Sequence, residues 1–161
     1  MEVKNKKIGF VFTGSFYSYK KVIEQMKNLK TFGAEILPIM SENSYNLDTK
    51  IGKSDVFIKE IEKISGKQII HTIIDAEKIG PNHLTDIMIV APASGNTISK
   101  LACDIIDTSA TMAVKSHLRN NLPVVIAPST NDGLRCQLSK YCYFIKQKKL
   151  LFCTISVKII L

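Results

Sequence analysis

No run of apolar residues in this sequence approaches the length needed to cross a membrane, so we expect no membrane-spanning segment. The apolar stretch Ile8–Phe12 is too short for a secretory signal, and polar Thr13-Gly14-Ser15 follow it at once. The 161 residues are enough for one domain with a sizeable core. These observations predict a cytoplasmic protein that makes no membrane contact.

Motifs for several common ligands are also missing. The sequence contains no G-x-G-x-x-G fingerprint of dinucleotide-binding folds and no Walker-type glycine loop with its lysine. The four cysteines form no C-x-x-C pair, and Cys136, Cys142 and Cys153 have no histidine nearby. We therefore expect no metal site and interpret the cysteines as free thiols in a reducing compartment.

Acidic residues are absent from Arg135 to the C-terminus, a segment that carries six lysines and arginines. Because the rest of the chain is close to balanced, the formal net charge of +8 belongs largely to this segment and does not indicate nucleic-acid binding. The segment also shows no clear amphipathic helix. We therefore divide the chain into an α/β domain, residues 1–134, and an atypical basic, cysteine-containing tail, residues 135–161.

Strand and helix patterns alternate along residues 1–134. The apolar runs predict strands at Lys7–Phe12, Ala34–Met40, Gln68–Ile74, Ile87–Val90 and Pro123–Ala127. Helical spacing predicts helices that end at Gly33, that run from Ser54 or Asp55 to Gly66, and that cover Asn96–Ile106 and Ser109–Asn120, with Ser41–Lys53 as a loop. This alternation predicts the α/β class, an open doubly wound parallel sheet in a Rossmann- or flavodoxin-like three-layer sandwich.

The turn after the fourth predicted strand is built from small residues, Ala91–Gly95, and leads into a helix that Asn96 or Thr97 is placed to cap. Free N–H groups at such a turn bind phosphate, although many similar turns are ordinary strand–helix connections. Ligands of doubly wound sheets bind beyond the carboxyl ends of the strands. The turns expected there are rich in Ser, Thr, Asn and Gly, which favours a mononucleotide-like ligand.

Three of these turns carry a family resemblance. The segment APASGNTISKLACDIID (Ala91–Asp107) resembles the A-P-A-S-A-N-T-x-x-K-x-A-x-G-I-x-D signature of the flavin-containing cysteine decarboxylase superfamily. VVIAPSTND (Val124–Asp132) resembles that superfamily's second signature, V-x-x-A-P-A-M-N, and Thr13-Gly14-Ser15 matches its first-strand turn. Within the superfamily, TGSFYSY (Thr13–Tyr19), DTKIGK (Asp48–Lys53) and LRNNLPVV (Leu118–Val125) are most similar to one subunit of a two-subunit oxidoreductase of sporulating bacteria.

The resemblance implies a cofactor, a substrate and partners. It implies an FMN site lined by Gly14, Ser15, Ser41, Ser94, Asn96 and Thr97, and it places Asn131 at the substrate carboxylate. It also implies a dehydrogenase-like partner subunit that uses NADP or NAD, and a homo-oligomer in the cytoplasm of the mother cell. The implied reaction oxidises a dihydro precursor to an aromatic pyridine dicarboxylate.

The catalytic histidine of the decarboxylases has no counterpart here, since Lys78 stands near its expected position and His83 lies too close to the fourth strand. We interpret His71 as a structural side chain inside the third predicted strand, and we assign no catalytic residue. The alternatives are therefore a structural partner without chemistry of its own and a flavin-dependent decarboxylase-like protein.

The tail after Leu134 departs from the superfamily, whose members continue with a glycine- and asparagine-rich helix start. We interpret residues 135–161 as the product of a reading-frame change near Leu134, and the alternative is a lineage-specific tail. Resequencing the gene around that codon distinguishes the two.

Overall fold

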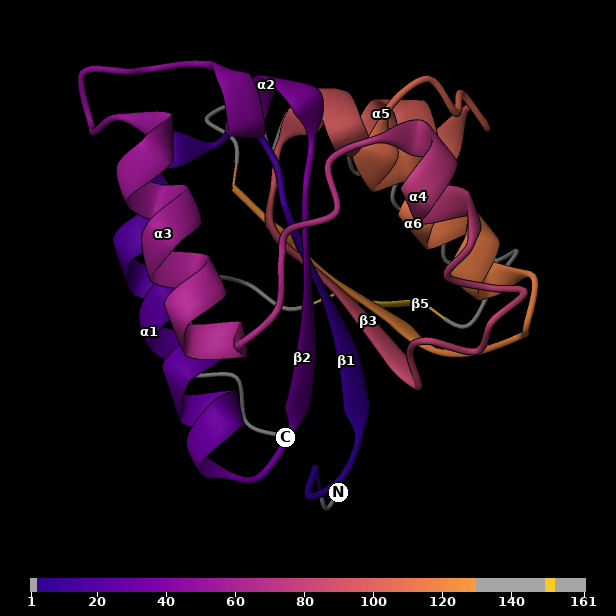
Figure 1. Cartoon of the computed structure of the whole chain (residues 1–161). Coiled ribbons are helices and arrows are strands. Elements are labelled where there is room, and N and C mark those ends of the chain that lie inside the picture. The colour runs from indigo at the N-terminus through magenta and orange to yellow at the C-terminus, as the bar shows by residue number, and fades with distance from the viewer. Residues whose placement is uncertain (1–2, 130–149, 153–161) are drawn as a thin grey trace.

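In the part of the chain that the structure describes, five parallel strands form a twisted central sheet (Figure 1). The computed structural model describes residues 3–129 and 150–152, and within them the strand order is β2-β1-β3-β4-β5. Every neighbouring pair is parallel. The strands are β1 (Lys7–Phe12), β2 (Glu35–Met40), β3 (Ile87–Ala93), β4 (Val124–Pro128) and β5 (Leu150–Phe152).

Helices cover both faces of the sheet. One face carries α1 (Tyr19–Thr31) and α3 (Ser54–Ser65), and the other carries α4 (Ile73–Glu77), α5 (Gly95–Ala102) and α6 (Ser109–Leu118) (Figure 1). Each face buries its own apolar cluster, the first around Phe10, Phe12 and Tyr19 and the second around Val90 and Ile98. All seven residues of β3 are buried, as expected for a central strand covered on both sides. The predicted open doubly wound α/β sandwich is therefore confirmed.

Two stretches differ from the prediction, and one of them is the third predicted strand, Gln68–Ile74. Only Ile70 pairs there, in an isolated bridge to Ile39, and the chain then leaves the sheet. The side chain of Thr72 accepts a hydrogen bond from the Asp75 N–H at 3.1 Å and so caps α4. His71 therefore lies between the bridge and this helix and not inside a strand.

The other stretch is Ser41–Lys53, predicted as a loop. It begins with the short helix α2 (Glu42–Asn46), because the hydroxyl of Ser41 accepts from the Ser44 N–H and caps it. A 3₁₀ turn, η1 (Phe16–Ser18), also precedes α1, and α5 and α6 end earlier than predicted. The backbone of β5 pairs with Val124–Ile126, whereas the predicted boundary at Leu134 lies outside the described residues.

No helix among the described residues is long and apolar enough to cross a membrane.

The buried imidazole of His117 gives the fold a predicted pH dependence. Its Nδ1 lies 2.8 Å from Thr85 Oγ1 and its Nε2 lies 3.0 Å from the carbonyl oxygen of Pro123. A neutral ring satisfies both contacts, with Nε2–H donating to Pro123 and Nδ1 accepting from Thr85. Burial lowers the pKa of His117 below its usual value of 6.5, more strongly than the Pro123 carbonyl and Asp86 raise it.

Since the unfolded chain binds this proton more readily, the contribution of His117 to the free energy of unfolding should be constant above about pH 7 and should fall as the pH drops through 6.5. The pKa values of the Asp48, Asp75 and Asp107 carboxyls are lowered from their usual 3.8, so the stability that these carboxylates contribute is lost only at more acidic pH. Urea denaturation at pH 7.5 and pH 5.5 measures the difference in the free energy of unfolding. The control is His83→Gln, which should keep this difference because His83 is exposed. Equal stability of the wild type at the two pH values would contradict the assignment.

Candidate functional site

A cavity of about 450 Å³ opens at the carboxyl ends of the strands. Its wall is formed by the turns after β1, β2 and β3 and by the start of α6, which follows α5 in the chain. The lining residues are polar or glycine: Gly14, Ser41, Glu42, Asn43, Ser94, Asn96, Thr97, Lys100, Asp107 and Thr108. Such a wall suits a polar ligand rich in hydrogen-bonding groups.

Three helices begin at this cavity, and the residue that caps each of them is part of its wall. Ser41, Ser94 and Thr108 are the N-caps of α2, α5 and α6. Their hydroxyl oxygens accept from N–H groups of the first turns, at 3.4 Å for Ser41, 3.3 Å for Ser94 and 3.1 Å for Thr108. The remaining N–H groups of the first turns have no partner within their helices, so this edge of the sheet favours anions and hydrogen-bond acceptors.

Thr13 at the end of β1 holds the turn between β3 and α5 in place. Its hydroxyl donates to the Pro92 carbonyl at 2.7 Å and accepts from the Ser94 N–H at 2.8 Å. The buried phenol of Tyr19 donates to the Thr13 carbonyl at 3.1 Å, and burial raises the pKa of this phenol, so it stays a neutral donor. The cavity wall is thus fixed by buried contacts between strands that are distant in sequence.

Most of the residues predicted for FMN lie together in this wall: Gly14, Ser41, Ser94, Asn96 and Thr97. Ser15 does not line the cavity, since its hydroxyl donates to the carbonyl and the hydroxyl of Ser129 at 2.8 and 2.7 Å. Asn131 lies outside the described residues. The prediction that Asn96 or Thr97 caps α5 is wrong, because Ser94 does so.

Sequence reasoning missed Glu42, Asn43, Lys100, Asp107 and Thr108 as members of the wall. Glu42 and Asn43 directly follow Ser41, so recognition of the short helix α2 would have placed them. Thr108 stands three residues before Thr111, which is the spacing of a capping box. In the structure these two residues form a capping box at the start of α6. Lys100 belongs to the segment that carries the first signature.

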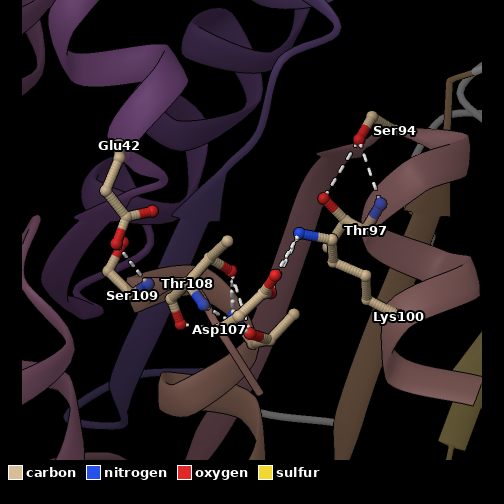
Figure 2. Close-up of polar contacts among 8 residues, drawn as sticks. Glu42, Ser94, Thr97, Lys100, Asp107, Thr108 and Ser109 are labelled. Carbon is tan, nitrogen blue, oxygen red and sulfur yellow. Dashed lines mark hydrogen bonds and ion pairs between the residues drawn. The ribbon is translucent and has the colours of Figure 1, made fainter. Parts of the chain in front are cut away.

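The charged groups of the wall are held by specific contacts (Figure 2). The Lys100 side chain is 23% exposed, and its ammonium lies 2.9 and 2.7 Å from the two carboxylate oxygens of Asp107. These hydrogen bonds lower the pKa of the Asp107 carboxyl. Glu42 Oε1 accepts from the Ser109 N–H at 2.8 Å, at the first residue of α6. Glu42 Oε2 is buried and has no hydrogen-bond partner among the described residues.

None of the three histidines lines the cavity. His71 stacks on Tyr45 with ring centroids 3.8 Å apart, and its Nδ1 lies 3.3 Å from the Ile69 carbonyl. His83 is exposed and His117 is buried between Thr85 and Pro123. Imidazole chemistry of the kind expected of a decarboxylase therefore has no support in this wall.

Comparison with known proteins gives consistent matches. The sequence model of the flavoprotein family matches residues 1–153. The dipicolinate synthase B subunit of Bacillus subtilis is 37% identical over 150 residues, which cover 93% of this chain and 75% of that protein. The crystal structure of the dipicolinate synthase B subunit from Bacillus halodurans C is 35% identical, has a TM-score of 0.83, and is matched over 94% of this chain and 78% of that one.

A more distant likeness extends to the FMN-dependent cysteine decarboxylase SpaF, with a TM-score of 0.66 at 18% identity over 94% of this chain and 86% of that one. At that identity the likeness shows the shared fold alone.

Proposed function

Because this chain belongs to the flavoprotein family and is a homologue of the dipicolinate synthase B subunit, we propose that it acts in dipicolinate synthesis. Together with the dehydrogenase-like A subunit of dipicolinate synthase, it oxidises a dihydrodipicolinate-type precursor to dipicolinate during sporulation. FMN is the proposed cofactor of this chain, and NADP or NAD enters through the A subunit. The complex acts in the cytoplasm of the mother cell, with this chain as a homo-oligomer.

One observation carries the proposal: the cavity wall gathers hydroxyl, amide and backbone groups from three turns at the carboxyl ends of β1, β2 and β3. A mononucleotide offers a phosphate, a polyol and a heterocycle, which these groups can bind without a large formal charge. FMN supplies electron-transfer chemistry when it is bound.

The residues fit such a ligand by two tests. A Cβ atom added at Gly14 would meet no atom within 4 Å, so the backbone there leaves open space against the cavity. The buried Glu42 Oε2 needs a hydrogen-bond donor that the described residues do not supply. Gly14, Ser41, Ser94, Asn96 and Thr97 would hold FMN, with Ser15 beside them through Ser129. Asn131 would meet a substrate carboxylate.

We expect the purified chain to bind FMN with micromolar affinity or better, which titration followed by flavin fluorescence and absorbance measures. Binding into a cavity with fixed walls should quench the fluorescence and shift the flavin spectrum. Unchanged spectra at micromolar FMN would remove the cofactor from the proposal and favour a protein that only supports the A subunit structurally.

The activity itself is tested by adding the A subunit, NADP or NAD and the dihydro precursor, and by following the absorbance of the pyridine product. The proposal expects full rate only when both subunits are present. Full rate without this chain would exclude a catalytic contribution. Release of carbon dioxide from a carboxyl-bearing thiol peptide would instead favour a decarboxylase-like protein.

A further inference from the structure

Glu42 has one carboxylate oxygen whose surroundings explain its position and one whose surroundings do not. Oε1 accepts from the Ser109 N–H at 2.8 Å and so satisfies an N–H group at the start of α6. Oε2 is shielded from solvent and has no partner among the described residues, although Glu42 lines the cavity. Figure 2 shows the second oxygen turned away from Ser109. A buried carboxylate oxygen without a donor is costly, so the arrangement calls for a partner.

Three donors of the surrounding residues are directed to other acceptors. The Lys100 ammonium is paired with both oxygens of Asp107, and the Ser109 hydroxyl donates to the Met40 carbonyl at 2.7 Å. The Ser41 hydroxyl lies 2.8 Å from that of Ser44. Because Glu42 lines the cavity, a bound ligand can supply the donor that Oε2 lacks, after a small rotation of the carboxylate toward the cavity.

We propose that Glu42 is a specificity-determining residue of the cavity, whose free oxygen accepts a hydrogen bond from an uncharged donor of the bound flavin. The inference rests on the proposed function, in which the cavity binds FMN. A phosphate oxygen offers no donor and carries like charge, so the carboxylate disfavours phosphate at this point of the wall. The donor is either a hydroxyl of the ribityl chain or the ring N–H.

Glu42→Gln tests this directly because the amide keeps the shape of the side chain. The Ser109 N–H is fixed by the backbone, so the amide oxygen should stay with it, and the NH₂ group should take the place of Oε2. The acceptor then becomes a donor that faces the donor of the ligand. We expect the affinity for FMN to fall by about ten- to a hundredfold, measured by fluorescence titration of the full chain.

Two controls separate a hydrogen bond from simple charge. Asp107→Asn also removes a negative charge from the wall, and electrostatics alone predicts that either variant binds the anionic FMN more tightly. Glu24→Gln removes a carboxylate from the exposed side of α1 and should leave the affinity unchanged. The inference is supported if FMN binds more weakly to Glu42→Gln but not to Asp107→Asn or Glu24→Gln.

Lumiflavin, which has the ring and its N–H but no ribityl chain, identifies the donor. Equal weakening of FMN and lumiflavin assigns it to the ring N–H, and weakening of FMN alone assigns it to a ribityl hydroxyl. The inference is overturned if Glu42→Gln binds FMN as the wild type does. It is also overturned if the melting temperature of this variant without ligand falls well below that of the wild type, because the oxygen then has a structural role. Failure of the wild type to bind FMN would instead remove the proposed cofactor.

Discussion

Replacing Gly80 by alanine should lower the free energy of unfolding by about 3 kcal/mol, near the upper end of what overpacking a core costs. An added Cβ would overlap the carbonyl oxygen of Ser116 and would lie 2.7 Å from its hydroxyl oxygen and 2.8 Å from its carbonyl carbon. The two segments cannot easily separate, because the Gly80 N–H donates to Ser116 Oγ at 2.8 Å and that hydroxyl donates to the Glu77 carbonyl at 2.6 Å. Urea denaturation measures the loss.

Gly14→Ala adds the same methyl group where no atom lies within 4 Å, and it should change the stability by only a few tenths of a kcal/mol. A Gly80→Ala protein as stable as Gly14→Ala would show that α4 and α6 separate freely, against the hydrogen bonds between them. The difference in stability between the two variants therefore measures the steric overlap at Gly80 separately from the general effect of replacing a glycine by alanine.

Much of the fold follows from local patterns in the sequence. The apolar run of β1 and the glycines that end the first two long helices are predicted at the residues where the structure has them, with Gly33 and Gly66 at φ values of 85° and 73°. Glycine adopts this left-handed conformation without strain. The prediction for Gln68–Ile74 is wrong because an apolar run of that length fits a strand or a buried turn equally, and Thr72 decides between them.

The site is predictable only where a turn follows a strand. The topological rule places the ends of β1, β2 and β3 at one edge, and residues from all three turns do line one cavity. The contributions of Asp107 and Thr108 depend on where α6 starts relative to β2, which is fixed by the Ser109–Met40 and Ser109–Glu42 hydrogen bonds. Contacts between residues so far apart in the chain leave no periodic signal in the sequence.

Replacing Gly14 by leucine should abolish FMN binding and leave the fold intact. A Cβ at this position meets no atom within 4 Å and the backbone is not left-handed, so the side chain can extend from the turn after β1 without displacing protein atoms. It would occupy part of the cavity that Gly14 lines, where a ligand needs close approach to the backbone. We expect the affinity for FMN to fall by at least about a hundredfold, which corresponds to about 2.8 kcal/mol, in a fluorescence titration.

Gly66→Leu is the matched control, since the same side chain is added at the end of α3, away from the cavity wall. Its left-handed φ of 73° should cost about 1 kcal/mol of stability and leave the affinity for FMN unchanged. The two variants should therefore show opposite effects, lost binding with normal stability at Gly14 and lost stability with normal binding at Gly66. A folded Gly14→Leu protein that binds FMN like the wild type would place the flavin outside this cavity, because a leucine at that point and a ligand held by the neighbouring Ser41 and Ser94 cannot share the same space.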